Sequence, residues 1–406
     1  MREMKDSGIE WIGDIPVYWK IMPNKYLMRK EKKICPVYHG EDILSLTMKG
    51  VIVRDLDAGG KMPASFDGYQ RLEAGNLLMC LFDIDVTPRC VGLIKQAGVS
   101  SPAYSQFVLR KGADAAYYCY YYTMLDNDKT LLHLAKNLRH SLTEDQLGAI
   151  PVIVPPIEEQ QRIADFLDTK CAEIDALTAD IQTQIDTLEQ YKRSVITETV
   201  TKGLDPDAEM KDSGIEWVGE IPAHWLVHPV YYYYGERKNK NYLGKEDNLL
   251  SLSYGRVVRK DINTSDGLLP ESFNTYNIVE TGDIIIRPTD LQNDKRSLRT
   301  GLVKEHGIIT SAYIDLCPIK QVDSRYFYFL LHAYDVMKVF YNMGNGVRQG
   351  LNYSEFSRLM VFEPPYDEQV AMADYLEAKV EEVDVVISDK KAQLATLDEY
   401  KKSLIF

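Results

Sequence analysis

The residues of this chain that are best suited to a functional site are clustered lysines and arginines, which can bind anionic groups. MRKEKK at 28–33 and ERKNK at 236–240 are two of them. Ammonium groups suit phosphate oxygens, and the arginine fork suits guanine edges in the major groove of DNA. A solvated surface charge is the commoner role for any one of these residues. For the set, placed in predicted loops, DNA contact is the better interpretation. The predicted DNA-binding residues are Arg29, Lys30, Lys49, Arg54, Arg89, Arg139, Arg256, Arg259, Lys295, Arg296, Arg299 and Arg348.

No catalytic constellation accompanies these cations in the sequence. It has no glycine-rich nucleotide-binding loop and no G-x-S-x-G motif. Its six cysteines are scattered, without a C-x-x-C pair or a histidine cluster beside them. EPPY at 363–366 is similar to the Asp/Asn-Pro-Pro-Tyr loop of adenine methyltransferases, but VPPI stands at the matching place, 154–157, and a strand-to-helix turn explains both. We therefore expect no catalytic residue, no metal site and no cofactor bound by this chain.

The overall negative charge of the chain opposes binding to DNA unless the acidic residues are concentrated in particular segments. The chain of 406 residues has an ordinary globular composition, with 45% hydrophobic and 26% charged residues, and a net charge of −13. Segments 158–202 and 367–406 each hold ten acidic and five basic residues. The rest of the chain is therefore nearly balanced and can form local basic patches.

The N-terminal sequence, the lengths of the apolar runs and the distribution of cysteines together predict a cytoplasmic location without membrane contact. The N-terminal MREMKDSG lacks the apolar stretch of a signal peptide, and no apolar run approaches the length of a membrane span. Dispersed cysteines suit a reducing compartment.

The stretch from Glu158 to about Lys202 predicts one long amphipathic helix. It contains neither proline nor glycine, while Pro155 and Pro156 precede it and Gly203 ends it. Its apolar residues recur at steps of three, four and seven, which is the spacing of a narrow two-helix seam. At about 1.5 Å per residue this helix is a rod of about 65 Å, and its apolar stripe requires a partner.

That partner is a second copy of the same pattern. MKDSGIEWIGDIP at 4–16 returns as MKDSGIEWVGEIP at 210–222, and GLIKQAGVSSPAY at 92–104 returns as GLVKEHGIITSAY at 301–313. PPIEEQ at 155–160 becomes PPYDEQ at 364–369, where the second long helical pattern begins. A repeat of this extent predicts two similar units. The predicted residues of the helix pair are Ile174, Leu177, Leu188, Tyr191, Val383, Val386, Leu397 and Tyr400.

Connectivity predicts how the two long helices pair. The first helix leads from the first unit to the second, and the second helix starts at the second unit, so the pair must be antiparallel to share a seam. We expect an α+β fold with two units of mostly antiparallel curved sheets and helices, related by an approximate two-fold axis. The predicted boundaries are 1–157 and 205–366 for the units, and 158–204 and 367–406 for the helices. Two tandem domains with independent helices are the alternative.

The two copies agree in their motifs and differ in their loops. Loops 83–91 and 290–300 match neither in length nor in composition. Two units that share a framework and differ in their loops are expected if each unit recognises a different target. The tyrosine runs YYCYYY at 117–122 and YYYY at 231–234 favour core packing over base stacking.

The whole chain resembles the specificity subunit of type I restriction–modification systems. The resemblance is carried by SGIEWIGDIP and SGIEWVGEIP, by PPIEEQ and PPYDEQ leading into IADFLD and MADYLE, and by EQYKRSVITETVTKGL with its echo DEYKKSLIF. It implies two target-recognition domains, each reading one half of a bipartite asymmetric site in double-stranded DNA, with the helices as a spacer. It also implies two modification subunits, which bind S-adenosylmethionine and methylate adenine, and restriction subunits that supply a motor and nuclease.

Two other classes of function remain open at this point. The chain could be a methyltransferase with its own target domain, which would need a cofactor fold of which the sequence shows no trace. It could also be a coiled-coil adaptor that binds protein only. Binding of S-adenosylmethionine by the chain alone would favour the first, and failure to bind any DNA would favour the second.

Overall fold

The computed structural model describes residues 3–57, 63–87, 89–135, 140–215, 217–262, 272–289, 291, 298–343 and 350–406. The chain divides into two compact units. Unit 1 comprises Met1–Ile181 and Ala392–Phe406, and unit 2 comprises Gln182–Lys391. The division cuts through the two longest helices, α4 (Ile157–Lys202) and α7 (Tyr366–Ile405), so each unit contains part of both.

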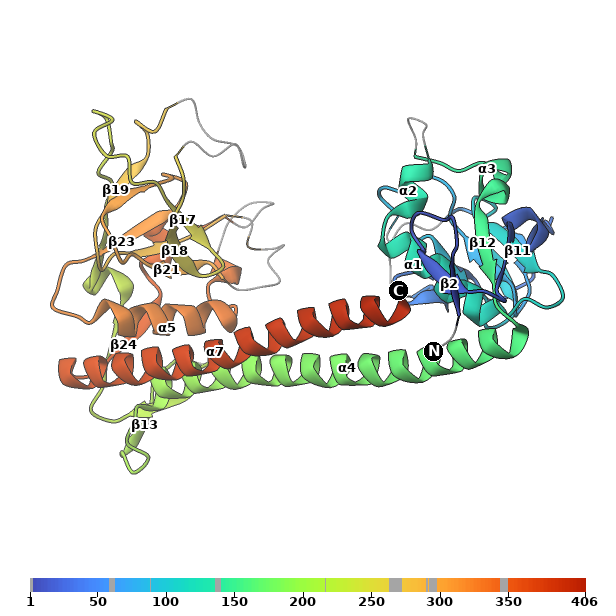
Figure 1. The fold of residues 1–406 in the computed structure, drawn as a ribbon. Coiled ribbons are helices and arrows are strands. Elements are labelled where there is room, and N and C mark those ends of the chain that lie inside the picture. The colour runs from blue at the N-terminus through green and yellow to red at the C-terminus, as the bar shows by residue number, and fades with distance from the viewer. Residues whose placement is uncertain are drawn as a thin grey trace. The chain divides into compact units, whose positions relative to one another are not determined.

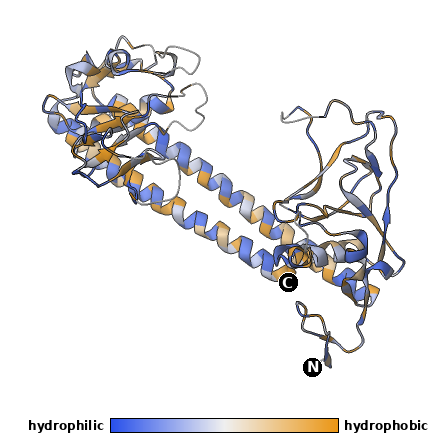
Figure 2. Cartoon of the chain, turned by 90° about the horizontal axis from the view of Figure 1, so that it is seen from above, coloured by the Kyte–Doolittle hydropathy of each residue, from blue (hydrophilic) through white to orange (hydrophobic). Residues whose placement is uncertain are grey.

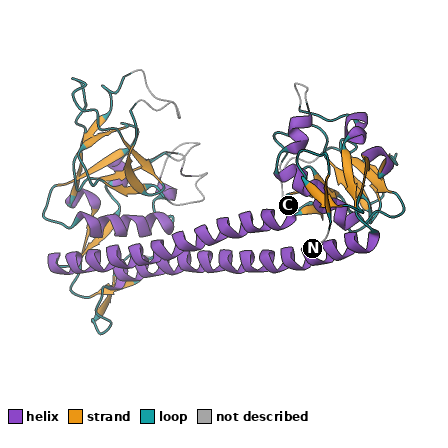
Figure 3. Ribbon diagram, viewed as in Figure 1, coloured by secondary structure: helices purple, strands orange, loops and turns teal. Residues whose placement is uncertain are grey.

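Unit 1 is built on antiparallel pairs of short strands (Figure 3). Its largest sheet has four strands in the order β4-β11-β8-β9, and β1–β2, β3–β12, β5–β6 and β7–β10 form two-stranded ladders. The described strands are β1 (Met4–Asp6), β2 (Asp14–Pro16), β3 (Lys20–Pro23), β4 (Met28–Glu31), β5 (Leu44–Thr47), β6 (Gly50–Val53), β7 (Gln70–Leu72), β8 (Leu77–Met79), β9 (Val91–Leu93), β10 (Gly98–Ser100), β11 (Ser105–Leu109) and β12 (Pro151–Val154). The shorter helices are η1 (Asn24–Tyr26), α1 (Ala115–Asn127), α2 (Thr130–Leu134) and α3 (Glu144–Ala149).

Unit 2 repeats this plan with the same strand order. Its four-stranded sheet runs β16-β23-β20-β21, and β13–β14, β15–β24, β17–β18 and β19–β22 are the two-stranded ladders. Its described strands are β13 (Met210–Asp212), β14 (Glu220–Pro222), β15 (Leu226–Pro229), β16 (Tyr234–Glu236), β17 (Leu250–Ser253), β18 (Arg256–Arg259), β19 (Asn277–Val279), β20 (Ile284–Ile286), β21 (Thr300–Leu302), β22 (Gly307–Ile309), β23 (Ile314–Pro318) and β24 (Met360–Glu363). Its shorter helices are η2 (Val230–Tyr232), α5 (Ser324–Val336), η4 (Tyr341–Met343) and α6 (Tyr353–Phe356). The predicted α+β class and internal repeat are confirmed.

Each unit has its own hydrophobic core. In unit 1 the buried face of α1 packs with the sheet and with β12, and it supplies four tyrosines, Tyr117, Tyr118, Tyr121 and Tyr122. In unit 2 the corresponding helix α5 is buried more completely and supplies phenylalanine and leucine as well as tyrosine. The interpretation of the YYCYYY run as mainly core is therefore confirmed at these four positions.

A buried glutamine explains why Pro-Pro-x-x-x-Gln occurs twice. The Gln160 side chain accepts a hydrogen bond from the Asp114 backbone N–H at 2.8 Å and donates to the Pro155 carbonyl at 2.8 Å. Gln369 does the same in unit 2, with Asp323 at 3.0 Å and Pro364 at 2.9 Å. Asp114 and Asp323 are the N-cap residues of α1 and α5. The motif therefore ties the start of each long helix to the start of the core helix beside it.

The two long helices pair antiparallel within each unit (Figure 1). In unit 2, Lys192 of α4 lies 2.5 Å from Asp384 of α7, and the earlier residue Gln184 bonds to the later residue Lys390. In unit 1, Asp175 of α4 lies 2.6 Å from Lys401 near the end of α7. Asp175 precedes Asp384 by 209 positions, and Lys192 precedes Lys401 by the same 209, so the same ion pair occurs once in each unit.

The predicted residues of the helix pair differ in burial. Hydrophobic residues interrupt hydrophilic ones at intervals along both helices (Figure 2). Ile174 and Val383 are buried, and Leu188 and Leu397 are partly buried. The other four predicted residues, Leu177, Tyr191, Val386 and Tyr400, are 40–51% exposed. Tyr191 lies at the edge of the helix pair, because it lines a small gap together with Lys379 and Val383 of α7. The buried apolar stripe runs through Leu167, Cys171, Ile174, Ile181 and Ile185 on α4 and through Val383 and Ile387 on α7.

Candidate nucleic-acid interface

Each unit presents a two-stranded hairpin at an equivalent place in its fold. Strand β5 pairs with β6 from Leu44↔Val53 to Thr47↔Gly50, and β17 pairs with β18 from Leu250↔Arg259 to Ser253↔Arg256. Two residues close each hairpin. In unit 2 these are Tyr254 and Gly255, with φ of 48° and 77°, which is the geometry of a type I′ turn. The hairpin is therefore a short, sharply closed element.

Glycines fix the hairpins against their sheets. A Cβ on Gly92 of β9 would lie 2.8 Å from Leu46 and Val51 of the unit 1 hairpin. A Cβ on Gly301 of β21 would lie 2.5 Å from Leu252 and 3.0 Å from Val257 of the unit 2 hairpin. No side chain fits in that space, which explains the glycine that begins both GLIK and GLVK. The close approach positions each hairpin rigidly on its frame.

The exposed side chains of the two hairpins differ although their frames agree. The tip of the unit 1 hairpin carries Met48 and Lys49, and its exposed strand positions include Ile52 and Val53. The tip of the unit 2 hairpin carries Tyr254, which is 70% exposed. Its strand β18 places Arg256 and Arg259 outward, each with a side chain 69% exposed. One hairpin thus presents aliphatic groups and one lysine, and the other presents an aromatic ring and two guanidinium groups.

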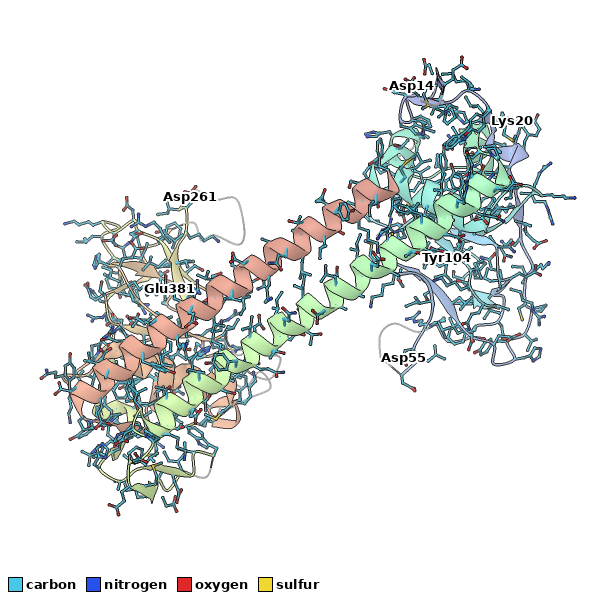
Figure 4. All side chains as sticks on the ribbon, turned by 60° about the horizontal axis from the view of Figure 1, so that its bottom comes forward. Asp14, Lys20, Asp55, Tyr104, Asp261 and Glu381 are labelled. Atoms are coloured by element: carbon cyan, nitrogen blue, oxygen red, sulfur yellow. The ribbon has the colours of Figure 1, made fainter. Side chains whose placement is uncertain are left out.

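Equivalent aspartates follow the two hairpins. Asp55 comes two residues after β6 and Asp261 two residues after β18, and both are exposed (Figure 4). The backbone N–H groups of their predecessors, Arg54 and Lys260, donate to the Ile43 and Leu249 carbonyls at 2.7 and 2.8 Å. These hydrogen bonds also fix the backbone that follows each hairpin. Arg54, one of the predicted DNA-binding residues, lies in this segment.

Predicted cations on β4 of unit 1 lie at the surface in weak ion pairs. The Arg29 guanidinium is 3.4 Å from Glu31, and the Lys30 ammonium is 3.7 Å from Glu144. Exposed pairs of this kind contribute about 0–1 kcal/mol and are screened by salt. Both cations can therefore exchange a carboxylate partner for a phosphate at small cost.

Arg256 and Arg259 in unit 2 also have carboxylate partners. Arg256 lies 2.6 Å from Asp384, and Arg259 lies 2.5 Å from Glu305. Asp384 also accepts from Lys192, so one carboxylate is shared by two cations and leaves a net positive charge at that point. This shared pair links the hairpin to the long helices of its own unit.

The structure corrects the prediction at Arg299 and places Arg89 in a largely internal position. Arg299 is only 6% exposed, and its guanidinium donates to the Arg287 and Thr289 carbonyls. The Arg89 side chain is 16% exposed and donates to Asn127 at 2.9 Å, with Asp126 3.5 Å away. Such buried donors hold loops in place and cannot reach a phosphate without leaving their partners unpaired. Arg299 is therefore removed from the candidate interface. Arg139, Lys295, Arg296 and Arg348 lie outside the described residues.

Sequence reasoning missed a polar cleft of about 990 Å³ in unit 2. It lies beside the hairpin and is lined by Tyr254 and Arg256 together with cations of the long helices, Lys192, Arg193 and Lys391. His332 also lines it, and burial, followed by the charges of Lys192 and Arg193, lowers the pKa of this imidazole to about 4. The dipeptides Lys192-Arg193 and Lys390-Lys391, within otherwise acidic helices, were the available signal. The four cations of the cleft, Lys192, Arg193, Arg256 and Lys391, outnumber its two carboxylates, Glu189 and Asp384, so it suits an anionic group such as a phosphate.

Metal-binding clusters and membrane-spanning helices were both sought in the part of the chain that the structure describes. That part holds no group of three or more His, Cys, Asp or Glu side chains placed to bind a metal ion. It also contains no helix with the length and apolar character that crossing a bilayer requires.

Comparison with known proteins shows a similarity over part of this chain. Residues 91–187, which run from β9 into α4, match the model of the type I restriction modification DNA specificity domain. Over these residues the chain is similar to that specificity domain. The predicted resemblance to the specificity subunits of these systems is thereby confirmed.

Two curated relatives share the specificity subunit description. The putative type I restriction enzyme MjaX specificity subunit of Methanocaldococcus jannaschii is 24% identical over 271 residues, which cover 65% of this chain and 60% of that protein. The MjaVIII specificity subunit of the same organism is 24% identical over 278 residues, which cover 63% and 60%. The match thus spans about 60% of the length of these relatives.

A solved structure shares the fold over nearly the full chain. It comes from a study of complex assembly and conformational transition in the type I R-M system. Its similar chain has a TM-score of 0.69 at 11% sequence identity, with 96% of this chain and 97% of that chain covered. At this identity the likeness concerns the fold alone.

Proposed function

We propose that this chain is the DNA specificity subunit of a type I restriction–modification complex, in which each unit reads one half of a bipartite asymmetric site. The observation that carries the proposal is the pair of hairpins, held on the same frame by Gly92 and Gly301 but exposing different side chains. A hairpin held in van der Waals contact with its sheet presents its exposed side chains in a reproducible position. Different side chains select different bases. The specificity domain at 91–187 supports the same assignment.

In this proposal the chain is a non-catalytic subunit. The modification subunits would bind S-adenosylmethionine and methylate adenine, and restriction subunits would cleave DNA. Acidic side chains on the exposed faces of α4 and α7, such as Asp165 beside the half-exposed Phe166, suit a docking surface for the modification subunits. The cations of unit 2 around Asp384 suit the DNA backbone, because a phosphate can replace the shared carboxylate.

Methylome sequencing of a host that carries this chain with its modification subunit tests the proposal. We expect one bipartite motif with methylated adenine in each half. Replacement of Tyr254, Arg256 and Arg259 by alanine should relax or abolish selectivity in one half and leave the other half unchanged. The matched control replaces Met48, Lys49 and Val53 and should affect the opposite half. Equal loss at both halves from either variant would contradict the assignment of one half-site to each unit.

Binding measurements separate the competing functions. The chain with modification subunits should shift DNA that contains the motif, and the shift should weaken as salt rises because phosphate contacts release counterions. If the assembled complex shifts no DNA, the chain is an adaptor for protein only. If the chain alone binds S-adenosylmethionine and methylates DNA, it is a methyltransferase.

A further inference from the structure

The two hairpins align residue for residue, so their side chains can be compared position by position. Gly50–Val53 of β6 corresponds to Arg256–Arg259 of β18, and a turn of two residues precedes each of these strands. Val51 and its counterpart Val257 both lie against the glycine of the neighbouring strand. The contacts that hold each hairpin in place are thus the same. A difference in what the two hairpins recognise therefore comes from their exposed side chains.

Two of the aligned positions carry arginine in unit 2 and no cation in unit 1. Gly50 stands at the position of Arg256. Val53 stands at the position of Arg259. Both arginine side chains are 69% exposed, whereas Lys49 is the one Lys or Arg in the sequence of the unit 1 hairpin. The unit 2 hairpin therefore offers two planar guanidinium groups that the unit 1 hairpin lacks.

The unit 1 hairpin exposes aliphatic side chains at positions where unit 2 has an aromatic or a charged one. Met48 is 61% exposed and Val53 is 44% exposed, and their counterparts are Tyr254 and Arg259. Ile52 is also exposed, but its counterpart in unit 2 is an exposed valine, so it does not distinguish the hairpins. Base pairs present one apolar group in the major groove, the C5 methyl group of thymine. Contact between that methyl group and Met48 or Val53 would remove apolar surface from water on both sides.

The ion pairs of the two arginines can be exchanged for contacts to a base. Arg259 pairs with Glu305, which also accepts a hydrogen bond from the Asn248 side-chain amide at 3.3 Å. Arg256 pairs with Asp384, which also pairs with a lysine of α4 at 2.5 Å. Each carboxylate therefore keeps a second donor when its arginine leaves. Because both arginine side chains are exposed, the exchange costs little.

A guanidinium group matches guanine in the major groove. Guanine presents two neighbouring acceptors, O6 and N7, and arginine can donate to both at once. A contact from the same arginine to a phosphate would be independent of the base, so its loss would lower the affinity for every sequence by the same factor. The two kinds of contact can therefore be separated by changing the base and the side chain together.

We propose that the unit 1 hairpin recognises thymine through its methyl group, and that the unit 2 hairpin recognises guanine through Arg256 and Arg259. The inference rests on the proposed function, in which each hairpin contacts the bases of one half-site. Met48 and Val53 supply the apolar surface for the methyl group. Because the two kinds of contact belong to different hairpins, each affects only one half of the recognised site.

The recognised motif gives the first test. Methylome sequencing yields the two half-sites, and the alanine variants of each hairpin assign one half-site to each unit. We expect the unit 1 half-site to contain a thymine besides the one that pairs with the methylated adenine, and the unit 2 half-site to contain a guanine on one strand. A unit 1 half-site without such a thymine, or a unit 2 half-site without guanine, would overturn the inference and leave the proposed function intact.

Base analogues in a duplex that carries the motif test the two contacts atom by atom. Uracil in place of thymine removes only the C5 methyl group, and 7-deazaguanine in place of guanine replaces the N7 acceptor by C–H. The affinity of the chain assembled with its modification subunits is measured by fluorescence anisotropy at fixed salt. Uracil in the unit 1 half-site should weaken binding about threefold, and 7-deazaguanine in the unit 2 half-site about fivefold. Losses of the same size with each analogue in the other half-site would overturn the inference.

Variants of the exposed side chains tie each effect to its hairpin. Met48→Ala with Val53→Ala should bind the thymine and uracil duplexes equally, because the apolar surface for the methyl group is removed. Arg256→Ala with Arg259→Ala should bind the guanine and 7-deazaguanine duplexes equally. If the arginine variant is weaker on both duplexes but keeps their ratio, the arginines contact phosphate and the inference is wrong for unit 2. If the variant of Met48 and Val53 still prefers thymine over uracil, it is wrong for unit 1.

Discussion

At the scale of single residues, unit 2 buries an ionisable carboxyl group where unit 1 has an amide that cannot ionise. Asp283 receives two hydrogen bonds from the Arg237 guanidinium, at 2.8 and 3.1 Å. Asp315 on the neighbouring strand is 1% exposed, and neither of its side-chain oxygens has a hydrogen-bond partner in the described part of the chain. Gln106 occupies the same strand position in unit 1. Burial, followed by the charge of Asp283, raises the pKa of Asp315 to about 8.

This geometry predicts that Asp315→Asn stabilises unit 2. A carboxyl whose folded pKa is raised contributes stability at low pH and loses it as pH rises from about 4 toward 8, because the unfolded state releases its proton first. The amide cannot ionise, so the variant should gain about 2 kcal/mol at pH 8 and little at pH 4. Urea unfolding at the two pH values measures the difference.

Asp283→Asn is the matched control for this prediction. It replaces the charged bidentate partner of Arg237 by a neutral amide and should destabilise by about 1–3 kcal/mol, because this partly buried guanidinium (29% exposed) loses two charge-assisted hydrogen bonds. If Asp315→Asn instead destabilises at pH 8, Asp315 is ionised in the folded protein and Arg237 serves both carboxylates.

At the scale of elements, the repeated motifs predicted the fold well, whereas the exposure of single side chains was difficult to predict from the sequence. The Pro-Pro-x-x-x-Gln turns recur because each copy needs the hydrogen bonds of the glutamine side chain. The GLIK and GLVK strands recur because only glycine fits against the hairpin in each copy. Half of the predicted helix-pair residues are 40–51% exposed, since Leu177 and Ile181 both continue an apolar series from Ile174 and only packing decides which of the two is buried. The burial of Arg299 could not be predicted from the sequence. An arginine in a loop has the same sequence context whether it donates to backbone carbonyls or faces solvent.

Alanine substitutions on α4 test the corrected seam. Ile174→Ala removes a buried side chain and should cost about 2–4 kcal/mol of unfolding free energy, whereas Leu177→Ala removes a half-exposed one and should cost under about 1 kcal/mol. Both residues lie in unit 1, so the same denaturant transition reports on both. Equal costs would mean that Leu177 is as deep in the helix pair as the sequence pattern implied.

The glycine under each hairpin carries a separate prediction. Gly301→Ala forces a methyl group to within 2.5 Å of Leu252, and such overpacking costs about 1–3 kcal/mol. Hydrogen exchange of the β17–β18 amides should accelerate about tenfold, while β5–β6 keeps its rate. Gly92→Ala should give the mirror result in unit 1. Acceleration of both hairpins by either variant would show that the hairpins are not independently docked.

At the scale of the whole molecule, the proposed function makes the helix pair a determinant of spacing in the DNA site. The same ion pair, Asp175–Lys401 in unit 1 and Asp384–Lys192 in unit 2, fixes the helix register once in each unit. A register fixed at two points allows a change of helix length only when both helices change together. A length change of seven residues preserves the apolar seam, because seven residues are two turns of a coiled coil.

Duplication of residues 182–188 in α4 together with 392–398 in α7 should therefore lengthen the unspecified spacer of the recognised site. Seven residues add about 10 Å of helix, which corresponds to at most about three base pairs at about 3.4 Å each. Both half-site sequences should stay the same, because neither hairpin is touched. Methylome sequencing reads the spacer directly. Duplication in α4 alone is the control and should abolish methylation, since it shifts one ion pair out of register. A doubly lengthened chain that keeps its original spacer would show that the helices do not set the distance between the half-sites.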